Sequence, residues 1–221
     1  MSRPLGVYWA GWGTLAFFLV VAAGLVARPA RGLPLIAEVF YDAVGSDNGH
    51  SFVELYGVPG ASLEGFVLEG VNGAGGGIGP RLDLSGVIGS EGLFVIADDL
   101  GDGTTLVSNA DAIANFDFQN GPDSIVLRFE GAVVDAVGYG SFGPGEVFAG
   151  EGRPAPDVPA GASLARHFAN VDSDDNAADF AQSLPSPGVA PIGVPEPTTA
   201  LLVGLGLIGL ARAGGRGARS R

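Results

Sequence analysis

Short apolar runs divided by clusters of Gly, Asn, Asp and Pro fill residues 35–140, and this pattern restricts the fold more than any other feature of the chain. The runs are rich in Val, Ile, Leu and aromatic residues, as strands are. No part of this stretch sustains the 3.6-residue period of an amphipathic helix. We therefore predict seven strands, at residues 35–41, 51–56, 62–71, 82–88, 93–97, 124–129 and 132–139.

Two of these runs indicate how their strands are buried. Residues 93–97 are apolar throughout, which is typical of a strand buried on both faces. In residues 124–129, Ile125 and Leu127 belong to an alternating pattern that predicts a half-buried strand. Glu130 and Gly131 then suit a two-residue hairpin loop, because Gly accepts a positive φ without steric cost.

About seven short strands in a stretch of roughly 160 residues predict an all-β domain, with an immunoglobulin-like β-sandwich as the first option. Two packed sheets bury alternate residues of each strand. The side chains expected to be buried are Val53, Leu55, Phe66, Leu68, Phe94, Ile96, Leu127, Phe129, Val134 and Tyr139.

Charge is distributed unevenly along the chain. All 24 Asp and Glu residues except Glu196 lie within residues 33–193, whereas only four of the 11 basic residues, all Arg, lie there. A surface this acidic repels phosphate backbones, which excludes nucleic acid as a partner. Because Cys is absent, neither disulfides nor thiol chemistry is available, and packing, alone or with a metal, must hold the fold.

Residues 1–32 have the features of a secretory signal peptide, whose apolar core we expect to be helical. Arg3 precedes an uncharged, increasingly apolar stretch that continues to Ala27. Cleavage after Ala27 or after Gly32 fits the preference for small residues, and Gly32 is the favoured position because strand 35–41 follows it closely. Arg28 and Arg31 lie on the side that should be exported, so an uncleaved N-terminal anchor is the alternative.

The C-terminal end contains three elements in a fixed order. Residues 191–199 form a linker that carries the tetrapeptide Val194, Pro195, Glu196 and Pro197. The apolar run 200–211 follows, and its 12 residues fall short of the roughly 20 that span a bilayer as a helix. The basic tail 212–221 contains Arg212, Arg216, Arg219 and Arg221. Cations after an apolar segment stop its transfer and stay on the cytoplasmic side.

This order closely resembles the PEP-CTERM sorting signal of exported bacterial proteins. The resemblance implies processing near the tetrapeptide by an exosortase-type enzyme, after a transient hold in the inner membrane. A short apolar segment suits a transient hold better than a permanent anchor. An ordinary short membrane tail is the alternative.

The middle of the chain, residues 35–188, resembles bacterial lamin tail domains. The strand motifs that carry the resemblance lie at residues 36–39, 52–56, 63–68, 92–98, 119–127 and 133–140. Its most specific part is a tail block in which residues 161–166 precede residues 172–180 and then 185–188. Lamin tail domains are immunoglobulin-like sandwiches, and in bacteria they are mostly exported modules without assigned catalysis.

The resemblance also implies a structural role for the tail block, with Arg166 as an internal partner of its acids. We expect Arg166 to be buried and paired with Asp172, Asp174, Asp175 or Glu54, because an arginine is rarely desolvated without a carboxylate.

Two acidic loops offer oxygen ligands of the kind that calcium binds. One contains Asp172, Asp174, Asp175 and Asn176, and the other contains Asp98, Asp99 and Asp102 before Gly103. Neither matches the twelve-residue EF-hand loop, because the central Gly and the closing Glu are missing. We interpret both as Asx-turns and strand-end caps, and predict no metal site and no cofactor.

Catalytic motifs are weak. His50 and His167 are the only histidines, and no nucleophile-elbow motif accompanies them. Residues 204–209 spell a dinucleotide-binding fingerprint, but they lie in the C-terminal apolar run with no βαβ unit around them. The Gly-rich residues 73–79 lack the Lys of a phosphate loop and suit a hairpin tip. We predict no catalytic residues and no enzyme activity.

These expectations combine into one organisation: a signal peptide (1–32), a sandwich domain (33–190), a linker with the sorting motif (191–199), a short membrane segment (200–211) and a cytoplasmic basic tail (212–221). The function expected is that of a non-enzymatic protein of the Gram-negative cell surface or extracellular matrix. Its partners would be the exosortase-type enzyme, the inner membrane transiently, and exopolysaccharide or surface proteins. The alternatives are a calcium-dependent adhesin or glycan-binding module, and a secreted hydrolase.

Overall fold

The computed structural model describes residues 32–190, which form ten strands and one helical turn. The predicted signal-peptide helix and the membrane segment 200–211 lie outside the described residues. Within residues 32–190, no helix is long and apolar enough to cross a membrane.

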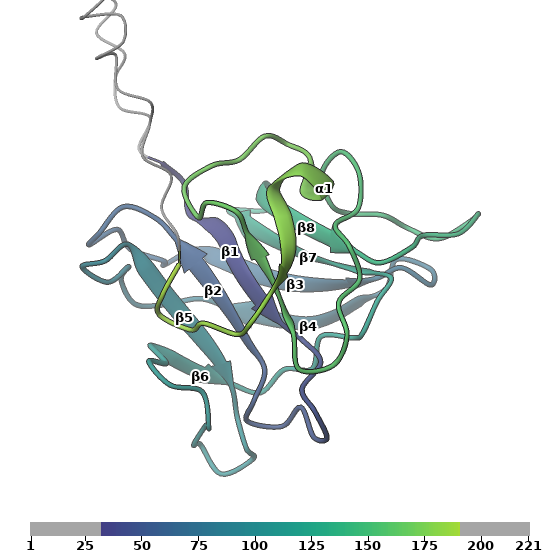
Figure 1. The fold of residues 1–221 in the computed structure, drawn as a ribbon. Helices are drawn as coiled ribbons and strands as arrows, with labels where there is room; N and C mark the ends of the chain where they lie inside the picture. The colour runs from purple at the N-terminus through teal and green to yellow at the C-terminus, as the bar shows by residue number, and fades with distance from the viewer. Residues whose placement is uncertain (1–31, 191–221) are drawn as a thin grey trace, which may run out of the picture. The chain divides into compact units, whose positions relative to one another are not determined.

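Six strands form the first sheet (Figure 1). In spatial order they are β10 (Phe180–Ser183), β9 (Ser163–Arg166), β1 (Leu35–Phe40), β2 (Phe52–Tyr56), β5 (Leu93–Asp98) and β6 (Ala112–Ala114). The β5–β6 pair is parallel and the other pairs are antiparallel.

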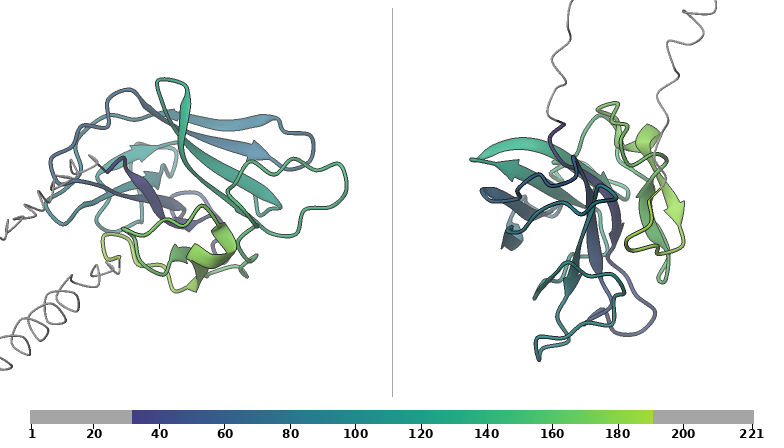
Figure 2. Two further views of the ribbon diagram at one scale, coloured as in Figure 1. Left: turned by 90° about the horizontal axis from the view of Figure 1, so that it is seen from above. Right: turned by 90° about the vertical axis from the view of Figure 1, so that its left-hand side faces the viewer.

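The second sheet is antiparallel throughout. Its order is β4 (Ile78–Asp83), β3 (Phe66–Asn72), β7 (Asp123–Phe129) and β8 (Ala132–Tyr139). The helical turn α1 (Asn176–Asp179) lies beside β8, and the chain from it enters β10 (Figure 2).

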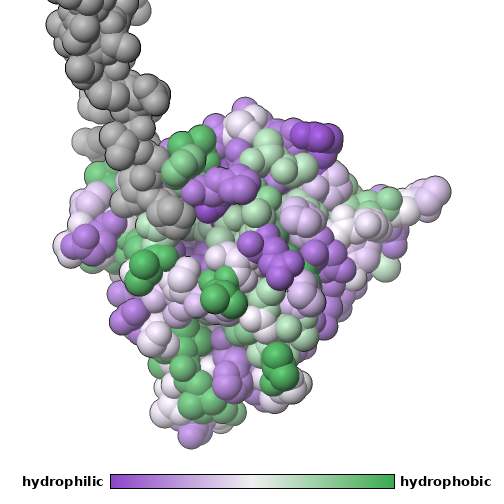
Figure 3. Space-filling view, in the orientation of Figure 1, coloured by the Kyte–Doolittle hydropathy of each residue, from purple (hydrophilic) through white to green (hydrophobic). Residues whose placement is uncertain are grey.

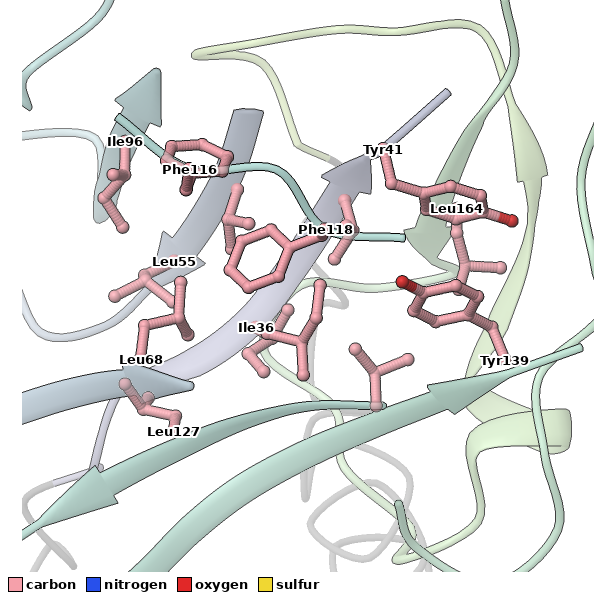
Figure 4. Close-up of a cluster of buried hydrophobic side chains, with 14 of the residues drawn as sticks. Ile36, Tyr41, Leu55, Leu68, Ile96, Phe116, Phe118, Leu127, Tyr139 and Leu164 are labelled. Atoms are coloured by element: carbon pink, nitrogen blue, oxygen red, sulfur yellow. The ribbon is translucent and has the colours of Figure 1, made fainter. Parts of the chain in front are cut away.

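One hydrophobic core is shared by the two sheets. Ile36 and Leu55 from the first sheet meet Leu68 and Leu127 from the second, and all four are fully buried (Figure 4). At one end of the core the rings of Tyr41 and Tyr139 stack with centroids 4.3 Å apart. The described part of the chain is therefore mostly β, with two sheets packed around a common core, which confirms the prediction of an all-β domain built from two packed sheets.

A second, smaller cluster covers the outer face of the first sheet. Phe40, Phe52 and Val95 pack there on three adjacent strands. Val95 therefore faces away from Phe94 and Ile96, which lie in the main core. The prediction that residues 93–97 are buried on both faces is confirmed, because every residue of β5 is buried.

The prediction for residues 124–129 is wrong on one face of the strand. Ile125 and Leu127 lie in the core as expected, but Val126 on the opposite face is only 1% exposed. It packs with Val71 and Ala136, and Ala149 from the loop after β8 packs against this cluster. The alternating pattern of the strand does not predict that a loop covers this face.

Strand bounds differ most around β4. The strand starts at Ile78, so the expected strand at 82–88 is displaced toward the N-terminus. Leu84 N still donates to Phe66 O of β3, and the backbone after it bonds to the loop before β3, with Leu63 N donating to Gly86 O and Ile88 N to Ala61 O. The strands β6, β9 and β10, of three or four residues each, were not predicted, because runs this short show no clear period.

Eight of the ten predicted core side chains are buried. The exceptions are Phe129 and Val134, which are partly buried against the core near the exposed β7–β8 turn. That turn has the predicted two-residue form, with φ of 50° at Glu130 and 85° at Gly131.

Candidate functional site

The predicted sorting-signal and stop-transfer residues lie outside the described part of the chain. They are Val194, Pro195, Glu196, Pro197, Arg212, Arg216, Arg219 and Arg221. The polar groups that the structure does place converge at two locations, one around Arg166 and one in the loops that follow β5.

Arg166 ends β9, and its side chain is completely enclosed. The guanidinium group lies 4.6 Å from the centroid of the Phe180 ring on the neighbouring strand β10. Its Nε donates to the carbonyl of Ile36 at 2.9 Å. Nη2 donates to Asp135 at 2.7 Å, and Nη1 donates to Asp179 at 2.8 Å.

A longer contact joins Arg166 Nη1 to Asp172 at 3.2 Å. The prediction that Arg166 is buried and paired with an acid of the tail block is therefore confirmed. Of the other acids named for this role, Asp175 pairs with Arg153 at 2.7 Å, Glu54 accepts from Gly188, and the exposed Asp174 forms no ion pair with Arg166.

The two shorter partners, Asp135 and Asp179, were not among the named candidates, although Asp179 lies within the tail block. Asp135 lies on β8 in the other sheet, 31 residues before Arg166, so no local spacing links the two. An acid inside the apolar run 133–137 was the available signal, because a charge in such a strand requires a buried partner.

Glu151 adds a fourth acid, and no ion pair among the described residues neutralises it. Carboxylate oxygens of Asp135, Glu151 and Asp172 all lie within 4.8 Å of one another. The Oε2 atom of Glu151 is buried without a hydrogen-bond partner. Burial, followed by the charges of Asp135 and Asp172, raises the pKa of Glu151 to about 8.

This cluster suits a proton better than a metal ion. Asp135 already accepts from the amide of Ile36 and from Arg166, and Asp172 also accepts from Arg166. A cation placed among the three acids would face the positive guanidinium that these two acids share. A proton on Glu151 removes one negative charge without that conflict.

The acidic loop that follows β5 and contains Asp98, Asp99 and Asp102 is built from turns. Asp98 is buried and accepts from the amides of Gly49 and Phe116. Asp99 Oδ1 accepts from three successive amides, those of residues 101–103, and Asp102 accepts from Thr104. These are the local bonds of Asx-turns, which is how the sequence was interpreted.

Asn176, in the acidic loop that begins at Asp172, bonds to the free edge of β8. Its side chain is buried, with Nδ2 donating to Ala136 O at 2.8 Å and Oδ1 accepting from Gly138 N at 2.8 Å. Oδ1 also accepts from the amide of Glu151 at 2.9 Å. The amide group therefore replaces a neighbouring strand along β8 and connects the tail block to the second sheet.

His50 and His167 are both exposed. His167 lines a shallow depression beside β9 and β10 whose lining includes no carboxylate. A separate cavity of about 250 Å³ lies between the β3–β4 hairpin and Phe118, with Asp123 as its only acid and no histidine. Neither concavity combines a histidine with an acid.

No protein-family model, curated protein or solved structure matches this chain.

Proposed function

We propose that this chain is a non-enzymatic exported protein of the bacterial cell surface or extracellular matrix, delivered through a PEP-CTERM signal. In this proposal the described β domain is a lamin tail-like module with an immunoglobulin-like arrangement. It is a structural or binding element that remains after an exosortase-type enzyme removes the tail.

The observation that carries the proposal is the order of elements after the domain. The last strand, β10, ends at Ser183, and the tetrapeptide at residues 194–197 follows only 11 residues later. The apolar run and the arginines come directly after it. Two prolines in the tetrapeptide disfavour helix and leave its backbone open to an enzyme.

Features of the domain support an extracellular, non-catalytic role. It contains no Cys and holds together by packing and buried polar contacts. The groups that most resemble a catalytic cluster, around Arg166, are enclosed and bonded to one another. On the face drawn in Figure 3, hydrophobic and hydrophilic residues are interspersed, as on a protein surface in contact with water.

The proposal is tested by expressing the chain in a cell that carries an exosortase and determining both termini of the mature protein by mass spectrometry. We expect a C-terminus near residues 194–197. Replacing Pro195, Glu196 and Pro197 with Ala should leave the full tail on a membrane-bound form. Pro191→Ala, a proline outside the tetrapeptide, is the matched control and should be processed normally.

An intact tail through Arg221 on the wild-type protein at the cell surface would contradict this function.

One observation favours a second candidate, a calcium-dependent adhesin. Asp135, Glu151 and Asp172 bring three carboxylate oxygens together, and Glu151 has a buried oxygen, Oε2, without a partner. The adjacent Arg166 weighs against it, so we place this function second.

A further inference from the structure

Residues 184–190 run back across the outer face of the six-stranded sheet, over β1 and β2 (Figure 1). The two large apolar side chains of this segment, Leu184 and Val189, are 80% and 67% exposed. Hydrophobic burial of these side chains therefore does not hold the segment on the sheet. Pro185 and Pro187 are half-buried, and the contacts that fix the segment to specific residues of the sheet are hydrogen bonds.

The segment contains a tight turn that presents its amides to the sheet. Val189 N donates to Ser186 O at 2.9 Å, which closes a four-residue turn. Pro187 occupies the second position, and Gly188 occupies the third with φ of +81°. This is the chemistry of a type II turn, in which only Gly takes the third position easily.

Two glutamates of the sheet receive the turn. Glu38 and Glu54 lie opposite each other in the β1–β2 register. Ser186 donates to both oxygens of Glu38, from its amide at 3.0 Å and its hydroxyl at 2.7 Å. Gly188 N donates to Glu54 Oε2 at 2.6 Å.

A β-bulge in β1, between Ile36 and Glu38, helps to place Glu38 there. The extra residue lets Ile36 and Val39 both face the core while Glu38 faces the turn.

Neither acid is paired with a positive charge. Glu38 and Glu54 are 1% and 0% exposed, and neither belongs to an ion pair among the described residues. Glu54 Oε1 is buried with no hydrogen-bond partner. Asp111, before β6, adds a further negative charge beside Glu54, and Val95 on β5 is apolar. Two adjacent buried carboxylates under these conditions favour a state in which at least one of them is protonated.

We propose that residues 184–190 form a proton-dependent latch. The latch lies on the sheet while the Glu38–Glu54 pair holds a proton and lifts away when that proton is lost. Its consequence for tail processing rests on the proposed function, whereas the latch itself does not.

The direction of the pH dependence follows from Glu54. Burial raises its pKa from the ordinary 4.5 to about 7; the amide of Gly188 acts against this shift, and the charges of Glu38 and Asp111 act with it. Burial also raises the pKa of Glu38. When the latch opens, water reaches the pair and these values return toward normal. The closed latch is therefore fully favoured below pH 4.5 and loses stability as the pH rises toward 7.

Opening changes how far the sorting tetrapeptide can move from the domain. With Gly188 held, Val194 is the sixth residue after the attachment point, a reach of about 20 Å when fully extended. With the chain free after Ser183, 11 residues give about 36 Å or slightly more. An enzyme that acts at the membrane would gain space next to its cleavage site.

Hydrogen exchange of the full chain in detergent micelles, followed by mass spectrometry at pH 5 and pH 7.5, tests the latch. Protection factors are corrected for the intrinsic effect of pH. We expect protection in residues 184–190 to fall about tenfold or more between the two pH values. Peptides from β7 and β8 report on global unfolding and should stay better protected than this segment at both pH values.

Glu54→Gln keeps the shape of the side chain and removes its titration, so this variant should hold the latch equally at both pH values. Glu64→Gln, at an exposed position, is the matched control and should behave as wild type. Ser186→Ala removes the hydroxyl donor to Glu38 and should lower protection at both pH values. This variant alters only the crossing segment, so it still tests the attachment if Glu54→Gln does not fold.

Equal protection of the wild-type segment at pH 5 and pH 7.5 would overturn the latch, as would an unchanged fall in Glu54→Gln. These readouts need no processing enzyme. A pH-dependent latch on a chain whose tail stays intact in cells would reject the sorting function alone. Normal processing with pH-independent protection would reject the latch alone.

Discussion

Replacing Arg166 with Ala should destabilise the domain more than any other single change to a charged residue described above. The substitution removes the shared partner of Asp135 and Asp179, whose side chains are 0% and 6% exposed, and of Asp172, at 23%. Removing one member of a buried ion pair typically costs about 3–5 kcal/mol, because the remaining charge has no compensation.

Protonation sets an independent upper bound on the free energy lost at each acid. The variant can relieve an uncompensated carboxylate by binding a proton there. For a carboxyl with an ordinary pKa of 3.8, this costs about 4 kcal/mol at pH 7 and less than about 2 kcal/mol at pH 5. We therefore expect a loss of about 3–5 kcal/mol in the free energy of unfolding at pH 7 and a clearly smaller loss at pH 5.

Urea unfolding of the purified chain, monitored by far-UV circular dichroism, measures the free energy of unfolding at pH 7 and at pH 5. A loss of this size should lower the thermal midpoint by on the order of ten degrees. Adding Asp135→Asn to Arg166→Ala should restore part of the stability, since it removes the most buried of the uncompensated charges. Arg153→Ala is the matched control, because that side chain is 72% exposed and its pair with Asp175 lies at the surface.

A loss below about 1 kcal/mol at pH 7, or one that does not shrink at pH 5, would refute the reasoning. It would mean that the three acids find other partners or that water reaches them.

Three further predictions concern other parts of the domain. Asn176→Ala should cost about 2–4 kcal/mol in urea unfolding, because two buried backbone groups of β8 lose their partner, whereas the exposed Asn48→Ala should change little. Millimolar calcium should raise the thermal midpoint no more than magnesium at equal ionic strength; a larger, saturable rise that Glu151→Gln abolishes would instead favour the adhesin function. The free energy of unfolding in urea should be larger at pH 5 than at pH 8.5, because the raised pKa values of Glu54 and Glu151 make proton loss unfavourable in the folded state. The same pH dependence in the Glu54→Gln, Glu151→Gln double variant would contradict this origin.

Local sequence was sufficient to predict much of the sheet structure. The uniform apolar run 93–97 identifies β5, and the Glu130-Gly131 pair identifies the β7–β8 turn. These features depend on the period of side chains along a strand and on the backbone freedom of Gly, both of which act over a few residues. Burial and an acidic partner for Arg166 were also predicted, although from resemblance rather than from spacing.

Tertiary structure alone decided the polar contacts. Asp135 meets Arg166 across two sheets, and Glu151 joins them from a loop. Glu38 and Glu54 occupy positions that suit solvent-facing residues of a strand, and they are buried because residues 184–190 return over them from the other end of the domain. Side-chain pattern records which face of a strand a residue occupies, but whether that face meets water depends on segments more than a hundred residues away. That distance is why the strands could be predicted from the sequence while the protonation of these buried acids could not.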